Sequence, residues 1–202
     1  IVETSIDTNY TNAMPGDCVL YEKEDIAFLL VPKCATSVIR DHETKRDGWS
    51  RMTVQDGHIC PKKFVVILRD PVDRFLSTVN MYLGWREVEP QTDYVTFKFD
   101  EGNSFYLESN DAHFKPQRTF LIDMFKAIAK SSKKVAVDYF YYNKNIYKDI
   151  NKEYGFDDFD LIDVNKRLMQ STKIVNNVDE SIIRQAYKAD YDLINSVQFK
   201  NL

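Results

Sequence analysis

The sequence predicts a single α/β domain with a mainly parallel central sheet flanked by helices. Two apolar runs, at residues 26–31 and 63–68, each end in a short polar junction and lead into a segment with helical spacing. A third run, at residues 133–140, is followed by an amphipathic segment at 143–154. Strands that alternate with helices in this way are typical of parallel sheets with helices on both faces.

Composition agrees with one domain of ordinary size. The chain has 202 residues, of which 44% are hydrophobic, enough to cover both faces of a sheet. We expect an N-terminal arm or edge hairpin over residues 1–25 and the domain proper over residues 26–202. The formal net charge of -4 argues against general nucleic-acid binding, so an anionic ligand must be held by a local basic cluster.

The cysteine pattern and the apolar runs exclude two further classes of protein. Cys18, Cys34 and Cys60 cannot all pair with one another, and they lack the density of a domain held together by disulfides. No run approaches the ~18 apolar residues of a membrane span. Residues with metal-ligand spacing are also absent from the sequence.

The junction after the first strand has the features of an anion site. Residues 28–40 read FLLVPKCATSVIR, which predicts a buried strand, a tight loop and a helix from about Thr36 to Lys45. The first N–H groups of a helix have no partner within it and carry the positive end of its dipole. The hydroxyls of Thr36 and Ser37 add donors, and Lys33 adds a full charge. The alternative is an ordinary helix cap after a strand.

The second junction carries another anion-binding group. Residues 63–77 read KFVVILRDPVDRFLS, a buried strand that runs into a helix with Pro71 in its first turn. Arg69 at the end of the strand can form two parallel hydrogen bonds with a phosphate. Ser77, two helical turns further on, can turn its hydroxyl toward the same group. Both junctions would lie at the carboxyl ends of strands, where open sheets bind ligands.

The two junctions together resemble the cofactor motifs of sulfotransferases that use PAPS, 3′-phosphoadenosine 5′-phosphosulfate. Residues 32–37 (PKCATS) resemble the 5′-phosphosulfate loop, P-K-x-(G/A)-x-(S/T), and differ from the Walker sequence G-x-x-x-x-G-K-(S/T). Residues 69–77 (RDPVDRFLS) are similar to the 3′-phosphate motif R-(D/N)-P-x-x-R, which has a Ser eight residues after the first Arg. The resemblance covers about residues 26–195.

Two further elements resemble the carbohydrate branch of this family, the membrane-associated and heparan 2-O-like enzymes. Gly57-His58 stands where several of these enzymes carry the base for the acceptor hydroxyl, and the pKa of a His suits that task. Residues 110–121 are similar to a D-x-H-x-x-P-Q element and match it at Asp111, His113, Pro116 and Gln117. The resemblance implies that these four residues face the acceptor or brace the site. His58 as a residue of a surface turn, and His113 as a loop cap, are the alternatives.

The resemblance implies a P-loop-NTPase-like sulfotransferase fold and transfer of a sulfuryl group from PAPS to a carbohydrate hydroxyl. Adenosine 3′,5′-bisphosphate (PAP) would leave while Lys33 neutralises the bridging oxygen, and no metal would be required. One departure from the family is Val38, where many members have Ser, Thr or Ala. The other implied roles are phosphosulfate binding by Cys34, Ala35, Thr36 and Ser37, 3′-phosphate binding by Arg69 and Ser77, and proton removal by His58.

The remaining segments are interpreted from local signals. Residues 49–60 suggest a short strand and a turn, and residues 178–197 have the apolar spacing of a C-terminal helix, like the Y-x-x-D-Y-x-L ending of the family. The helix at 143–154 would end at Gly155. Residues 86–112 form a long irregular insertion that could grip a sugar-like acceptor or act as a lid. Its candidate contact residues are Tyr94, Phe97 and Tyr106.

Several alternatives stay open at this level. The chain could be a P-loop-type nucleotide kinase, which the missing Walker sequence disfavours, or a non-catalytic module that binds glycans or a protein. His113, Asp56 or Asp111 could replace His58 as the base. Because the chain begins at Ile1 without Met, we expect the cytoplasm if it is complete and the Golgi lumen if an N-terminal anchor was removed. The sequence indicates no oligomeric state.

Overall fold

A computed structural model describes residues 15–54, 60–85, 113–156 and 180–202. Five strands form one sheet in the spatial order β3-β1-β2-β4-β5. In chain order the strands are β1 (Asp17–Tyr21), β2 (Ile26–Leu29), β3 (Trp49–Thr53), β4 (Lys63–Leu68) and β5 (Ala136–Tyr141). The helices are α1 (Thr36–Lys45), α2 (Pro71–Trp85), α3 (Gln117–Lys130), α4 (Ile146–Tyr154), α6 (Glu180–Ala186) and α7 (Lys188–Ser196).

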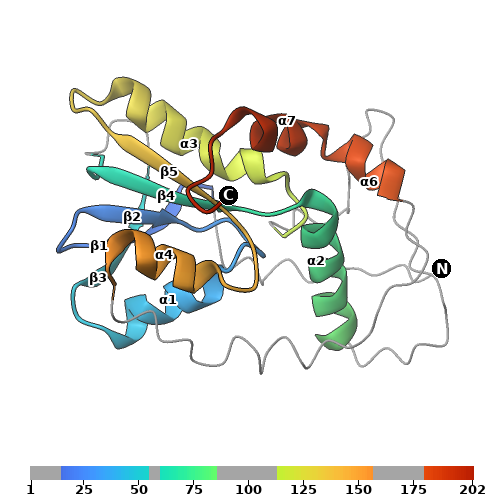
Figure 1. Cartoon of the computed structure of the whole chain (residues 1–202), viewed down its shortest axis with the longest axis horizontal. Helices are drawn as coiled ribbons and strands as arrows, with labels where there is room; N and C mark the ends of the chain where they lie inside the picture. Colours follow the sequence, from blue (N-terminus) through green and yellow to red (C-terminus); the bar gives the residue numbers. More distant parts are fainter. Residues whose placement is uncertain (1–14, 55–59, 86–112, 157–179) are drawn as a thin grey trace.

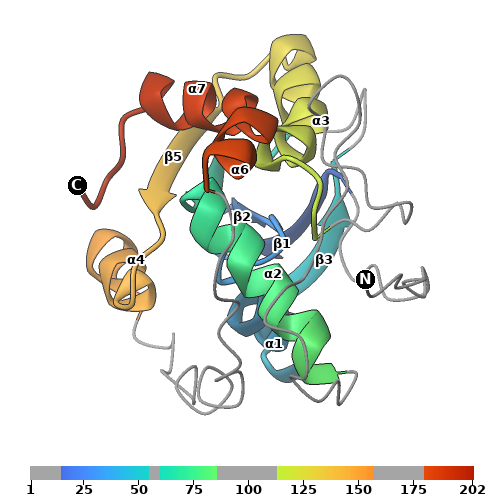
Figure 2. The ribbon, with the colours of Figure 1, turned by 90° about the vertical axis from the view of Figure 1, so that its right-hand side faces the viewer.

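The helices form layers on both sides of the sheet. α1 and α4 cover one face, and α3 and α7 cover the other (Figure 1). Figure 2 shows the molecule from the end where α2 begins, with α2 standing across the end of the sheet. The α/β class predicted from the sequence is therefore confirmed.

The sheet is mixed, which corrects the expectation of a mainly parallel sheet. β2, β4 and β5 are parallel neighbours, whereas β1 pairs antiparallel with both β2 and β3. The physical reason is the tight turn between β1 and β2, in which Asp25 adopts φ 54°. A connection this short can join only antiparallel neighbours. Among the five strands, parallel pairing thus joins the two strands that lead into the junctions, β2 and β4, and β5.

The first strand lies inside the sheet and is not part of an arm or edge hairpin. β1 has β3 on one side and β2 on the other, and its residues Cys18 and Val19 are fully buried. Gly16, just before β1, has φ 84°, and a Cβ atom there would lie 2.5 Å from the carbonyl oxygen of Val54. β3 can approach β1 this closely because residue 16 has no side chain.

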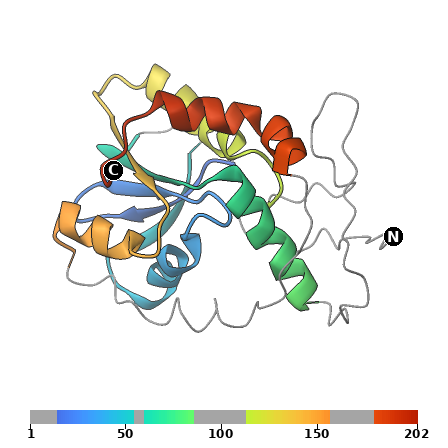
Figure 3. The same ribbon diagram turned by 45° about the vertical axis from the view of Figure 1, so that its right-hand side comes forward.

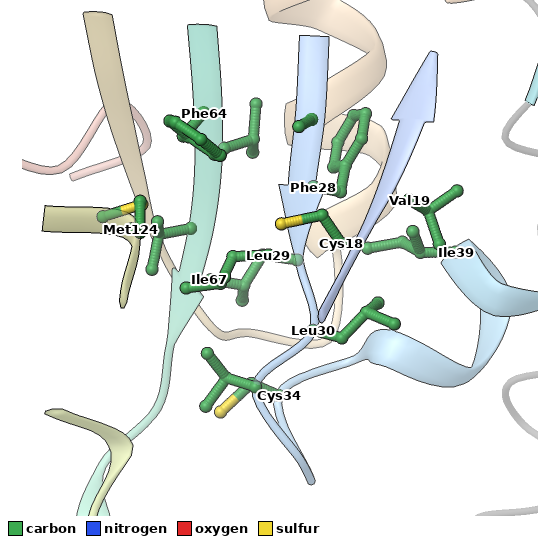
Figure 4. Packing of buried hydrophobic residues seen from close by; sticks show 14 of the residues in the cluster. Cys18, Val19, Phe28, Leu29, Leu30, Cys34, Ile39, Phe64, Ile67 and Met124 are labelled. Carbon is green, nitrogen blue, oxygen red and sulfur yellow. The ribbon is translucent and has the colours of Figure 1, made fainter. Parts of the chain in front are cut away.

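The core runs through the sheet and fixes the strand that leads into the first junction. Leu29 at the end of β2 and Leu30 just after it are buried in one core cluster with Ile67 of β4, Ile39 of α1 and Met124 of α3 (Figure 4). Fully burying a Leu or Ile side chain stabilises a fold by about 1.5–3 kcal/mol. The first junction therefore starts from a strand that packing holds in place.

The helices expected at the two junctions are confirmed, and two other regions differ. α1 and α2 begin at Thr36 and Pro71 as predicted. The expected helix over 178–197 is interrupted at Tyr187, whose buried hydroxyl donates to the carbonyl oxygen of Phe114 (2.6 Å). α3 was not predicted, although its buried residues follow helical spacing: Gln117, Phe120, Leu121, Met124 and Ala127.

The chain beyond α7 covers the outer edge of β5. The amide of Lys200 donates to Tyr139 (2.9 Å), and the side chain of Asn201 makes two hydrogen bonds with the backbone of Tyr141 (2.8 and 2.9 Å). An edge strand covered in this way offers few free backbone groups to another chain.

Among the described helices, none has the length and hydropathy needed to cross a bilayer.

Candidate anion-binding site

The loop between β2 and α1 has a constrained backbone. Lys33 and Ala35 adopt φ 63° and φ 60°, a left-handed conformation that costs residues with side chains roughly 1–2 kcal/mol each. Such backbones persist where the surroundings enforce them. Here the amide of Cys34 donates to Val31 (3.2 Å), and the hydroxyl of Tyr147 on α4 donates to the carbonyl oxygen of Ala35. The loop is therefore shaped without a ligand.

The N-terminus of α1 opens directly from this loop. Its N-cap residue is Ala35, no side chain caps the helix, and its first turn has no acidic residue. The first-turn N–H groups lack intrahelical partners and carry partial positive charge. Thr36 is buried and Ser37 is half-buried at this end. An anion at the loop could accept hydrogen bonds from these groups.

Arg69 follows β4 and lies beside the β2–α1 loop. Figure 3 shows the start of α2 next to this loop. Its Nη1 donates to the carbonyl oxygen of Lys33 (3.3 Å), and its guanidinium lies 4.3 Å from the ring centroid of Tyr142. Its Nε is buried and has no hydrogen-bond partner among the described residues. The side chain is thus oriented by its neighbours and keeps donors, Nε among them, for another group.

Arg74 joins the loop to the segment before α3. Its side chain is 2% exposed, its Nε donates to Pro32 (2.8 Å), and its Nη1 donates to Lys115 (2.8 Å). Its Nη2 is also buried without a partner in the described part of the chain. No role for Arg74 was predicted, although it is the last residue of the R-D-P-x-x-R pattern. That pattern was the signal that could have identified it.

The charges around the loop are predominantly positive. Burial and the like charges of Arg69 and Arg74 lower the pKa of Lys33 to about 8. The nearby Asp70 uses one carboxylate oxygen to cap α2, accepting from the amides of Val72 (2.9 Å) and Asp73 (3.1 Å). A bound anion would stabilise all three cations, so the electrostatics favour a negatively charged ligand.

Gln117 braces the site and does not reach an acceptor. Its side chain is fully buried at the start of α3. Its Oε1 accepts from the amide of Arg69 (2.9 Å) and from the thiol of Cys34 (3.3 Å), and its Nε2 donates to the carbonyl oxygen of Arg69 (2.8 Å). Of the two roles expected for Gln117, these contacts support bracing, because a buried side chain with these partners cannot also contact an acceptor.

Cys34 contributes no free donor, in contrast to the expectation that it binds the cofactor. Its amide and its thiol are both engaged within the protein. Burial raises the pKa of the thiol to about 11, so it stays protonated and can donate to Gln117. The expected phosphosulfate contacts therefore reduce to Lys33, Ala35, Thr36 and Ser37.

The other expected site residues are placed only in part. Ser77 is half-buried on α2, two turns after Arg69, and no hydrogen bond joins the two among the described residues. His113 is half-buried before α3, and its carbonyl oxygen accepts from the hydroxyl of Thr78 on α2 (3.3 Å). Six candidates lie outside the described residues: Asp56, His58, Tyr94, Phe97, Tyr106 and Asp111.

Three other residues support the site without having been predicted. They are Tyr142, Tyr147 and Asp190, and each acts through a contact with a partner distant in sequence.

Within the described ranges, no group of three or more His, Cys, Asp or Glu side chains could hold a metal ion. Comparisons with protein-family models, curated proteins and solved structures give no match for this chain.

Proposed function

We propose that this chain is a sulfotransferase that moves a sulfuryl group from PAPS to a hydroxyl of a carbohydrate acceptor. The observation that carries the proposal is the convergence of Lys33, Arg69 and the buried Arg74 at the uncapped N-terminus of α1. Two buried guanidinium nitrogens there lack a partner among the described residues. A site of this kind needs an anion to balance its charge and to accept its hydrogen bonds.

The arrangement also supports a ligand with two separate anionic groups. The loop follows β2 and Arg69 follows β4, and these strands are parallel neighbours, so both groups stand at the carboxyl edge of the sheet. Adjacent strands lie about 4.8 Å apart, so a single nucleotide can reach both groups. Because both anion-binding groups follow parallel neighbouring strands, we also propose a P-loop-NTPase-like sulfotransferase fold.

The proposed reaction assigns a task to each group. The acceptor oxygen forms a bond to sulfur, and the bond between sulfur and the bridging oxygen breaks as PAP leaves. The ammonium of Lys33 stabilises the negative charge that develops on the bridging oxygen. Because a bound anion raises the pKa of Lys33 from about 8, the ligand itself keeps this residue protonated. His58 takes the acceptor proton in this proposal.

The remaining residues hold the nucleotide. Thr36, Ser37 and the first-turn amides of α1 bind the 5′-phosphosulfate, while Arg69 and Ser77 bind the 3′-phosphate. Arg74 acts as a positioning residue, because its hydrogen bonds to Pro32 and Lys115 fix the loop against the segment that carries His113.

The test is transfer of labelled sulfate from PAPS to a panel of polysaccharides and small alcohols. The native protein should label at least one acceptor, and Lys33→Ala should lower turnover by ~10²–10³-fold, as for loss of one preorganised charge-stabilising group. Lys133→Ala removes the same side chain from an exposed loop and should leave turnover unchanged.

Two outcomes would overturn the proposal. Binding of PAP without transfer to any acceptor would indicate a non-catalytic module. ATP-dependent phosphoryl transfer without PAP binding would indicate a nucleotide kinase.

A further inference from the structure

One buried side chain contacts both halves of the candidate site, the β2–α1 loop with Lys33 and the residue Arg69 after β4. The amide group of Gln117 makes two hydrogen bonds to the backbone of Arg69 and accepts a third from the thiol of Cys34 in the β2–α1 loop. The orientation of the amide is determined by these partners. A flipped amide would place its NH₂ against the N–H of Arg69 and its oxygen against the carbonyl oxygen of Arg69, so both hydrogen bonds would be lost.

Gln117 is itself held by a carboxylate from the C-terminal helix. Asp190 on α7 is fully buried, and its two oxygens accept from the amides of Gln117 (2.9 Å) and Arg118 (3.0 Å). The N-cap of α3 is Pro116, and no side chain next to it in sequence caps the helix. Asp190 therefore supplies the cap from a distant element and fixes where Gln117 begins.

We infer that Gln117 is a positioning residue that sets the separation between the Lys33 loop and Arg69, and so selects nucleotides with phosphates at both the 3′ and 5′ positions. The inference rests on the proposed function. Its physical basis is that Gln117 binds the backbone N–H and C=O of Arg69. These bonds fix the point of the backbone from which the Arg69 side chain extends. The two phosphates of PAP are joined through one ribose, so both can be bound only when the two halves stand at the matching distance.

A purely structural role for Gln117 makes a different prediction. Loss of a core residue would weaken the binding of every nucleotide by a similar factor. Loss of a residue that sets the separation weakens the binding of PAP more than that of adenosine 5′-monophosphate. PAP needs both the Lys33 loop and Arg69, whereas adenosine 5′-monophosphate needs only one of them. The ratio of the two affinities therefore distinguishes the roles, and stability alone does not.

The experiment measures both affinities by titration calorimetry for the native protein and for Gln117→Met, which keeps the length of the side chain and removes the amide. We expect the preference for PAP to fall about tenfold, because the backbone of Arg69 loses both hydrogen bonds that hold it in place. Gln185→Met makes the same change at an exposed position of α6 and should leave the preference unchanged.

Asp190→Asn keeps the protein testable if Gln117→Met fails to fold. It retains the shape of the cap but has one acceptor oxygen in place of two, so one of the two amide hydrogen bonds is lost. It should reduce the preference for PAP in the same direction by a smaller factor. An unchanged preference in the folded variants, with both affinities reduced equally, would overturn the inference. Failure of the proposed function is seen separately in the native protein, which would then show no preference for PAP or no transfer of sulfate from PAPS.

Discussion

The hydroxyl of Tyr147 on α4 donates a hydrogen bond to the carbonyl oxygen of Ala35, the left-handed residue that precedes α1. The two residues are 112 positions apart in the sequence. α4 therefore helps to hold the loop in a conformation that Ala35 would rarely adopt alone. The shape of the anion site thus depends on a helix that contributes no charge to it.

Tyr147→Phe tests this dependence. The change keeps the buried ring and removes one hydrogen bond, so the free energy of unfolding should fall by about 1 kcal/mol. Affinity for PAP should fall severalfold because the loop is released from one of its restraints. Both quantities can be measured by chemical denaturation and calorimetry on the same samples.

Tyr154→Phe is the matched control for that variant. It removes a hydroxyl on the same helix that donates to Asp138 (2.6 Å), away from the loop. Stability should fall by a comparable amount while the affinity for PAP is retained. Equal losses of affinity in the two variants would show that α4 acts on the site only through general stability.

The affinity for PAP should decrease as the pH rises above about 8. The pKa of Lys33 is about 8 in the free protein, and a bound anion raises it, so the complex holds more protons than the free protein in this range. The phosphate groups have lost their last proton well below this range, with a second pKa near 6. We expect roughly a tenfold loss of affinity between pH 8 and pH 9.5.

Lys33→Arg identifies the group responsible for the pH dependence. An Arg side chain stays charged throughout, so the affinity of this variant should be nearly constant between pH 8 and pH 9.5. The same slope in the variant and in the native protein would assign the titration to another group.

Arg69→Ala should remove most of the preference for PAP over adenosine 5′-monophosphate. Gln117 binds the backbone of residue 69, so the truncation removes only the guanidinium and leaves the brace in place. Arg118→Ala, at an exposed position of α3, controls for the loss of one positive charge. Equal affinities for the two nucleotides in the native protein would contradict the assignment of Arg69 to the 3′-phosphate.

The identity of the base is tested by comparing His58→Ala with His113→Ala in steady-state kinetics on one acceptor. His58→Ala should abolish transfer and leave PAP binding intact, whereas His113→Ala should mainly raise the acceptor KM. The contact of His113 with Thr78 uses its backbone carbonyl, which the substitution preserves. Reversed effects would exchange the two roles, and activity in both variants would favour Asp56 or Asp111.

The local parts of the site could be predicted from the sequence. The strand, loop and helix around Lys33 and the start of α2 at Pro71 depend on neighbouring residues, and both agree with the structure. The contacts of Gln117 with Arg69 and of Arg74 with Lys115 could not be predicted, because both depend on which distant segments pack together. The pairing of β1 with β3 and the break at Tyr187 depend in the same way on tertiary contacts.

The position of Asp190 near the C-terminal end of this sequence affects when the site can form during synthesis. Asp190 caps α3 and thereby holds Gln117 beneath Arg69. While a ribosome adds about 5–20 residues per second, the β2–α1 loop and Arg69 leave the exit tunnel several seconds before α7 does. A nascent chain therefore lacks the Asp190 cap until α7 has emerged, so the proposed nucleotide site cannot be complete before then.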